Sequence, residues 1–384
     1  MLGVRHKMKQ TNNAIKFLMA QYRAIFKNAN IAMVAAMVAA ALAAGQAQAA
    51  ADTTNPDKAG TTELKDNILS SEEVKLDSDN KAVVLDAANT GSITLNNEGK
   101  ITLTSTATSH IFSKNDLVVN SGGSISLTGT SGAKTDVAGL VGAAKYTAGQ
   151  PQAVPTASLT INKGGKLDVN SSFARMKDVN INGTVSIKGT TGNNTTDAQS
   201  GEYLKYAAVY AEAGNLTVGQ DAAVTLGAAS HLYGQNVAIN GGTIAFEGST
   251  AAGKASTLNG GALLRAGDST NGGALTISNG KLNVAKGKSG DIVATTLKMK
   301  GGEINVSGTM GIGGNYHPGA DVAEIDVTGG KVTVVKDATL NLGGNASFAD
   351  GTLANAGTVN VVIPQDGTRT LNVSSQVFTE LLKG

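Results

Sequence analysis

The chain has 384 residues, which is enough for two average domains or for one long repeat array. It contains 49 Gly but neither Cys nor Trp, and only 4% of its residues are aromatic, too few to fill the compact core of a globular enzyme of this size. Because Cys is absent, disulfides and thiolate metal sites are excluded. The formal net charge is +2, but residues 1–49 hold six basic residues and no acidic one, so the remaining chain is mildly acidic. This charge argues against nucleic acid as a partner.

Residues 1–49 have the three-part layout of an extended secretory signal peptide. A basic stretch precedes the uncharged run IAMVAAMVAAALAA, Ile31 to Ala44, and the small residues after it predict cleavage after Ala49 or Ala51. The alternative is a membrane anchor, which needs about 20 apolar residues to cross the hydrocarbon core. The shorter run therefore predicts contact with the export machinery and no membrane span in the mature chain.

The rest of the chain divides into three parts. Residues 50–80 are polar and contain Pro56, which predicts an N-terminal cap or tether that protects the first strands from edge-to-edge association. Residues 81–373 form the expected β-helix repeat region. Residues 374–384, SSQVFTELLKG, form a short C-terminal tail that favours no more than a short helix.

Internal repeats dominate residues 81–373. The segments SHIFSKNDLVVNSGGSISLTG from Ser109 and SHLYGQNVAINGGTIAFEG from Ser230 match almost position for position, and SSFARMKDVNINGTVSIKG from Ser171 is a third copy. Each copy reads as a first strand, a polar spacer, a second strand, an Asn-Gly turn and a third strand. About eight or nine recognisable units of this kind predict a repeat architecture.

Within a unit the apolar residues alternate, as they do in half-buried strands. Leu159 and Ile161 share one face of a strand, and Leu167 and Val169 share one face of the next. We expect the turns between such strands to use residues that tolerate a left-handed backbone, namely Gly and a set of recurring Asn residues. The recurring residues are Asn120, Asn162, Asn182, Asn240 and Asn279.

Each unit has three strands and, without insertions, a length of about 19 to 23 residues. This pattern predicts an all-β fold, a right-handed parallel β-helix. Roughly fourteen turns of about 21 residues would stack at the spacing of paired strands. The alternative is an array of sandwiches or barrels, in which antiparallel hairpins also pair strands around Asn-Gly turns.

Five insertions interrupt the repeat at a few corners, and we expect them to place loops along the same faces of the solenoid. They are residues 130–138, 145–157, 190–206, 266–274 and 315–324. Loops on a rigid scaffold often form binding surfaces, so these segments are the predicted site of any recognition. Surface loops without a binding role are the alternative.

Histidine and aspartate residues are the candidates for catalytic or metal-binding chemistry. His110 and His231 occupy the same position in two copies, which predicts structural residues of the repeat. Asp77 and Asp79 form a D-x-D pair, but the sequence around them does not complete a calcium loop.

The remaining candidate for a metal lies in the last insertion. His317 is near Asp321, Glu324 and Asp326, but the spacing matches no established ligand motif and favours a solvated loop. The double glycines lack both the Lys of a phosphate-binding loop and the helix that should follow it. The sequence therefore predicts no catalytic residue, no cofactor and no metal site.

Some β-helices act on polysaccharides, and this defines the alternative function. Such enzymes need clustered carboxylates and basic residues on one face, together with aromatic platforms for sugars. Asp168, Arg175 and Asp178 are the nearest approach to such a cluster, but charged residues usually just solvate an outer face. A non-enzymatic protein is the first expectation, and a polysaccharide lyase or hydrolase is the alternative.

The extended signal peptide followed by Gly-, Asn- and Thr-rich repeats without Cys resembles the passenger region of autotransporters, the adhesin-like proteins of type V secretion. The resemblance implies export by a Gram-negative bacterium, a place at the cell surface or outside the cell, and binding of host or neighbouring-cell ligands, protein or glycan. The chain reaches Gly384 without the alternating strands, about ten residues each, of the family's C-terminal outer-membrane barrel. For a truncated chain, a periplasmic location is the expectation.

Overall fold

In the computed structural model, the predicted signal peptide, residues 1–49, lies outside the described residues. The described residues are 60–64, 67–77, 82–87, 91–105, 109–129, 139–143, 154–189, 207–249, 261–267, 272–313, 323–362 and 369–383. This part of the chain is all-β. Its 29 strands join in one hydrogen-bonded sheet, and one short helix follows them.

Almost every strand pair is parallel, which confirms the predicted all-β fold with parallel strands. Among the described residues, the antiparallel contacts are one isolated bridge and the short pairing of β19 (Gly248–Ser249) with β22 (Lys288–Val293). Each strand pairs with its counterpart one repeat earlier and one repeat later. Antiparallel hairpins, the alternative expected from the Asn-Gly turns, are therefore not how the repeats pair.

The strands form three columns, and a long strand can contribute to two or three of them. Column 1 contains β1 (Gly60–Leu64), β4 (Ala82–Ala87), β7 (His110–Ser113), β10 (Gly139–Val141), β13 (Phe173–Met176), β16 (Ala207–Val218), β18 (Ser230–Phe246), β20 (Ala262–Ala266), β22, β24 (Thr309–Gly313), β26 (Thr339–Phe348) and β28 (Thr358–Val361).

Columns 2 and 3 are built in the same way. Column 2 contains β2 (Ile68–Leu69), β5 (Ile93–Leu95), β8 (Leu117–Val119), β11 (Leu159–Ile161), β14 (Val179–Ile181), parts of β16 and β18, β21 (Ala274–Val284), β23 (Thr296–Val306), β25 (Ala323–Val334), part of β26 and β29 (Leu371–Val373). Column 3 contains β3 (Glu73–Leu76), β6 (Lys100–Ser105), β9 (Ser124–Gly129), β12 (Lys166–Asn170), β15 (Thr184–Lys188), β17 (Ala223–Leu226), the ends of β18, β21, β23 and β25, and β27 (Leu353–Asn355).

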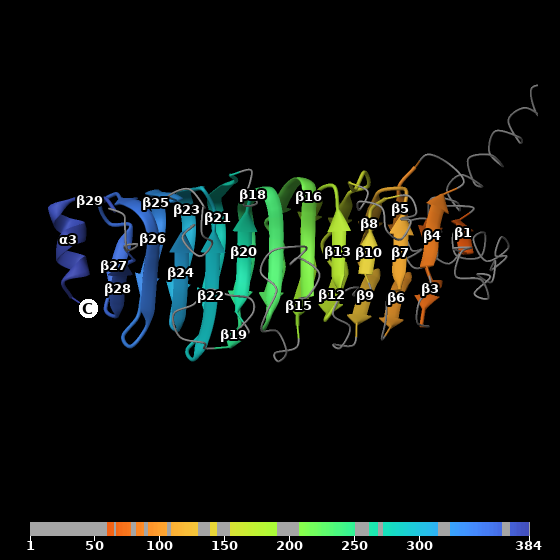
Figure 1. Cartoon of the computed structure of the whole chain (residues 1–384), viewed down its shortest axis with the longest axis horizontal. Coiled ribbons are helices and arrows are strands. Elements are labelled where there is room, and N and C mark those ends of the chain that lie inside the picture. Colours follow the sequence, from red (N-terminus) through yellow and green to blue (C-terminus); the bar gives the residue numbers. More distant parts are fainter. Residues whose placement is uncertain are drawn as a thin grey trace, which may run out of the picture. The chain divides into compact units, whose positions relative to one another are not determined.

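One layer is a passage of the chain through columns 1, 2 and 3. The layers follow one another in chain order, so that the strands run in sequence from β1 to β28 across Figure 1. Column 1 has twelve layers among the described residues, fewer than the roughly fourteen expected from the length of a repeat unit without insertions. The difference arises because insertions lengthen some layers; for example, Phe173 pairs with Ala208 across the insertion at residues 190–206.

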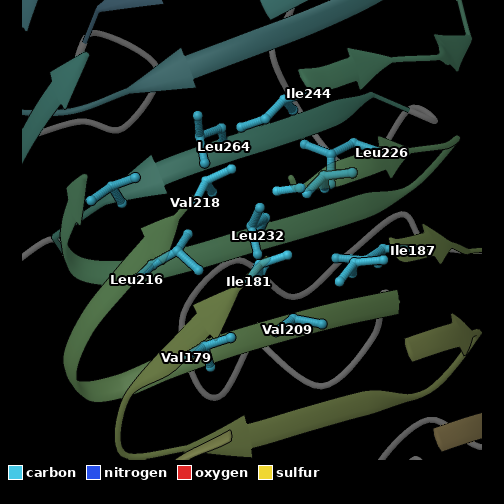
Figure 2. Packing of buried hydrophobic residues seen from close by; sticks show 14 of the residues in the cluster. Val179, Ile181, Ile187, Val209, Leu216, Val218, Leu226, Leu232, Ile244 and Leu264 are labelled. Carbon is cyan, nitrogen blue, oxygen red and sulfur yellow. The ribbon is translucent and has the colours of Figure 1, made fainter. Parts of the chain in front are cut away.

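The main core lies between the three columns, where alternate side chains of each strand point inward. Leu159, Ile161, Leu167 and Val169 are all buried there, as their alternation predicts. Figure 2 shows how the aliphatic side chains of successive layers meet in this interior. The main core is thin and filled by Val, Ile, Leu and Ala, which explains why the chain needs so few aromatic residues.

The corner between columns 2 and 3 corrects the expected role of the recurring Asn residues. None of the five has a positive φ. The left-handed residue of the corner is a glycine in several layers, such as Gly242 with φ of 66°, and Asn97 with φ of 51° in the layer of β5 and β6. The Asn side chains instead form a ladder between layers: Asn120 Nδ2 donates to Asn96 Oδ1 at 2.7 Å, and Asn162 Nδ2 donates to Asn120 Oδ1 at 2.8 Å. The ladder joins the three layers of Asn96, Asn120 and Asn162, where the amide of Asn120 both donates and accepts along the stack.

The two ends of the stack differ. Strands β1 to β3 already form a layer within residues 60–76, ahead of the boundary expected at residue 81, and a strand as short as Ile68–Leu69 leaves little alternation to detect in the sequence. At the C-terminal end, helix α3 (Ser375–Leu381) contacts β27 and β29 and packs Val377 against the main core. The Ser374 hydroxyl caps this helix by accepting from the Val377 N–H.

Candidate functional site

The outward face of column 1 carries a run of apolar and aromatic side chains. In each strand the alternate residues fill the main core, so their neighbours point away from it. The outward-pointing residues from β4 to β18 are here called the outer strip. They are Ala82, Val84, His110, Phe112, Val141, Phe173, Arg175, Ala208, Tyr210, His231 and Tyr233.

Aromatic rings of successive layers contact one another along the outer strip. The ring centroids of His110 and Phe173 are 5.8 Å apart, and those of Tyr210 and Tyr233 are 5.9 Å apart. Tyr210 also meets His231 edge to face at 5.4 Å. These contacts contribute about 0.5–1.5 kcal/mol each beyond the buried area. The outer strip is therefore a second hydrophobic cluster outside the main core.

The outer strip is buried although it points outward. Phe112 and Phe173 are 2% exposed, and Tyr233 is 5% exposed. A sugar platform must present an open ring face to its ligand, and these rings do not. The outer strip thus serves to hold the column 1 side of the molecule together.

One member of the outer strip, Arg175 on β13, forms an ion pair. Arg175 donates from Nε to Glu212 Oε2 at 2.7 Å and from one terminal nitrogen to Glu212 Oε1 at 2.6 Å, a bidentate geometry. The Arg175 side chain is only 9% exposed, whereas that of Glu212 is 36% exposed. In the next layers, Tyr233 donates to Gln235, and Arg265 donates to the Gly267 carbonyl.

The structure separates the three residues that came nearest to a sugar-cleaving cluster. Arg175 is bound to Glu212, as described above. Asp178 accepts a hydrogen bond from the Asn215 N–H at 2.8 Å and so joins two layers at the corner between columns 1 and 2. Asp168 is exposed on column 3, in register with serines of the layers on either side. Each residue has its own structural partner or position, and the three do not form one site.

The histidines and the acidic groups also fall into structural positions. His110 and His231 lie in the same row of column 1, as the repeat predicts. His317, Asp321 and Asp79 lie outside the described residues, while Asp77 pairs with Lys75 at 2.9 Å.

Two further carboxylates bond to the next layer instead of gathering around an ion. Glu324 accepts from Asn345 Nδ2 at 2.7 Å, and Asp326 accepts from the Ser347 hydroxyl at 2.8 Å. Within the described part of the chain, no group of three His, Asp or Glu side chains is placed to hold a metal ion.

One outward carboxyl of column 1 has an unusual environment. Asp291 on β22 is in register with Leu263 of the layer before and Gly311 of the layer after. Burial raises the pKa of this carboxyl from 3.8 to about 7, and a hydrogen bond from the Gly311 backbone opposes that rise. Asp291 therefore titrates near neutral pH.

A groove of about 490 Å³ opens on another part of the surface, at the corner between columns 2 and 3. It is lined by Gln220, Asp221, Ala222, Gly241, Gly242, Thr243, Asn279, Gly280, Lys281, Gly302 and Glu303. In one layer the corner is a separate turn between β16 and β17, whereas in the next three layers β18, β21 and β23 pass through the corner without a break. The separate turn between β16 and β17 therefore lies beside three tighter corners, and this difference in turn length forms the groove. We refer to it as the corner groove.

The five predicted insertions lie wholly or partly outside the described residues, but the strands that flank them are described. Every insertion directly precedes or follows a strand of column 1, namely β10, β16, β20 or β24. The corner between columns 2 and 3 carries none. The flanking strands thus place the insertions at the two corners next to column 1.

Sequence reasoning missed the outer strip, although a signal for it exists. The first strand of each unit departs from alternation, as in HIFS from His110, FARM from Phe173 and HLYG from His231. Each segment places a large aromatic side chain directly beside an inward apolar residue, and neighbouring positions of this kind indicate a strand that is buried on both faces. Their recurrence in the repeat accounts for these residues one strand at a time, whereas the cluster forms only when the outward side chains of successive layers meet.

No protein-family model, curated protein or solved structure matches the chain. The described residues also include no helix with the length and apolar character that a membrane crossing requires. The functional argument therefore depends on the geometry alone.

Proposed function

We propose that the protein is an exported, non-enzymatic surface or secreted protein, built as a right-handed parallel β-helix, that binds ligands through the insertions beside column 1. In this proposal residues 1–49 are the signal peptide that brings the chain to the export machinery. The mature chain then acts at the cell surface or outside the cell. Autotransporter passengers are the class that this organisation resembles.

The observation that carries the proposal is the placement of the insertions. All five adjoin column 1, and none adjoins the corner between columns 2 and 3. The insertions fall at the two corners that flank column 1. A repeat scaffold that adds chain around one face presents that face as an extended surface, the arrangement that repeat proteins use for binding. The buried outer strip supports this interpretation, because it gives the same side a rigid base.

The ligands we propose are proteins or glycans of host or neighbouring cells. Outside residues 1–49 the chain has more Asp and Glu than Lys and Arg, which disfavours nucleic acid. No observation favours the alternative of a polysaccharide lyase or hydrolase, since Asp168, Arg175 and Asp178 hold separate positions.

Binding to cells and matrix tests the proposal directly. The chain is expressed with its leader in a Gram-negative host, and the exported protein is assayed on a panel of cells and matrix components. Replacing residues 190–206 by a short Gly-Ser linker should reduce binding. The matched control changes three exposed or half-exposed column 3 residues, Lys166, Asp168 and Lys188, to Ala and should leave binding intact.

Three outcomes would count against the proposal. The first is failure of the exported protein to bind across the panel. The second is binding as strong as that of the unmodified protein when residues 190–206, or any of the other insertions, are replaced by the linker. The third is release of reducing or unsaturated sugar ends from a polysaccharide panel, which would favour the enzyme instead. Sequencing the N-terminus of the exported protein separately tests cleavage after Ala49 or Ala51.

A further inference from the structure

The corner groove spans four successive layers and is straight because the layers repeat. Its walls and floor come from the turn before β17 and from β18, β21 and β23. Thr243, Lys281 and Glu303 stand in register in three of these layers. At about 4.8 Å per layer the lining therefore extends over roughly 14 Å. A ligand lying in it meets similar groups at regular intervals.

The floor of the corner groove is bare because side chains do not fit there. A Cβ on Gly302 would lie 2.6 Å from the Gly280 carbonyl oxygen, and a Cβ on Gly241 would lie 2.6 Å from the Gln220 Cα. Glycine is thus required for close stacking of the corners. A ligand in the groove consequently lies against backbone, with polar side chains on either side.

The charges around the corner groove are paired. Lys281 Nζ lies 3.2 Å from Glu303 Oε2, and Lys163 Nζ lies 3.0 Å from Asp221 Oδ1. Hydrogen bonds from Lys281 and then from Asn305 hold the pKa of Glu303 below its ordinary value, so the carboxylate is ionised at neutral pH. The lining is accordingly polar but close to neutral.

The lining excludes several classes of ligand. Ala222 is the only apolar side chain among the described lining residues, so a lipid chain or an apolar peptide finds no matching surface. A peptide cannot add as a strand, because the strands at the groove are already paired on both sides. A polyanion would meet the carboxylates of Asp221 and Glu303 without a surplus of cations.

We propose that the corner groove binds a short stretch of a neutral linear oligosaccharide. Its hydroxyl groups would bond to the amides of Gln220 and Asn279, to Thr243 and to the paired charges. A polymer of sugar rings is itself periodic and can repeat its contacts from layer to layer. This site goes beyond the proposed function, because it lies at the corner that has no insertions and does not depend on them.

Calorimetric titration of the purified exported protein tests the site. The probes are cellotetraose, maltotetraose and chitotetraose, with tetragalacturonate as the anionic comparison. At least one neutral tetrasaccharide should bind. The double substitution Gln220→Ala and Asn279→Ala should weaken that binding at least tenfold. If the double variant does not fold, Asn279→Ala alone provides the same test with a smaller expected loss.

The matched control is Lys331→Ala. Lys331 follows Glu303 in the same row of column 3 and is exposed, but it does not line the corner groove. It should leave binding unchanged. The proposal is overturned if no neutral tetrasaccharide binds, if tetragalacturonate binds more tightly, or if the groove variant and the control behave alike.

The cell-binding assay separates this proposal from the proposed function. If the protein adheres to cells but binds no neutral tetrasaccharide, the oligosaccharide site in the corner groove is refuted and the proposed function is not. A protein that binds a tetrasaccharide through Gln220 and Asn279 but adheres to nothing has the opposite consequence.

Discussion

The outward faces of column 1 and column 3 have the same parallel backbone pairing but opposite surfaces. On column 1 the outward rings of Phe112, Phe173 and Tyr210 are buried. On column 3 the outward positions are occupied by polar residues, Lys, Asp and Asn in β12 and Thr, Ser and Lys in β15, and they are partly or fully exposed. The difference comes from side chains and from the insertions that adjoin column 1, which marks column 1 as the elaborated side of the scaffold.

The largest effect should follow from removing a ring of the outer strip. Phe173→Ala deletes a buried aromatic side chain that contacts His110, and we expect a loss of about 3–5 kcal/mol in the free energy of unfolding. Ser186→Ala on the outward face of column 3 should change it by less than about 0.5 kcal/mol. Urea unfolding followed by circular dichroism measures both. Equal losses would show that the two faces are not different.

The ion pair between Arg175 of the outer strip and Glu212 sharpens the comparison. Glu212→Ala leaves the guanidinium of Arg175 buried without its carboxylate, and we expect a loss of about 2 kcal/mol because Glu212 itself is partly exposed. Asp221→Ala breaks the exposed pair with Lys163 and should cost at most about 1 kcal/mol. The same unfolding experiment compares them, and a larger loss for Asp221→Ala would contradict the assignment.

The strands and the Arg175–Glu212 ion pair differ in how far the sequence could predict them. Alternation at Leu159 and Ile161 predicted the strands, and the repeat predicted how they recur, because both signals are local. The pairing of Arg175 with Glu212 joins residues on either side of the insertion at 190–206, and no local pattern links them. The corner groove likewise arises from a difference in turn length between layers, which becomes visible only when the layers are stacked.

The pH dependence of stability tests the far end of the column 1 face. Since the folded pKa of Asp291 is about 7 against 3.8 ordinarily, its contribution to stability is greatest below pH 4 and is lost as the pH rises towards 7. Asp291→Asn removes that ionisation. We expect a higher midpoint of thermal unfolding than wild type at pH 8 and no gain at pH 4. Asp168→Asn on column 3 is the control and should show no such difference, and a gain for Asp291→Asn at both pH values would refute the explanation.

The smallest expected loss of stability concerns hydrogen bonds between Asn side chains of successive layers. Such bonds occur in the last layers of column 1 as well as at the corner between columns 2 and 3. In those column 1 layers the outward residues are Asn341 and Asn360, and Asn360 Nδ2 donates to Asn341 Oδ1 at 3.0 Å. Asn120 lies in the middle of its ladder and bonds to the layers on both sides, through Asn96 and Asn162.

Each such bond contributes about 0.5–1.5 kcal/mol net, so Asn120→Ala should lower the free energy of unfolding by roughly 1–2 kcal/mol and Asn360→Ala by about half as much. Urea unfolding of the two variants checks the ratio. Equal losses would mean that the ladder does not act between layers. The expected ratio would show instead that an Asn of the last column 1 layers stabilises the stack in the same way as the Asn ladder at the corner between columns 2 and 3.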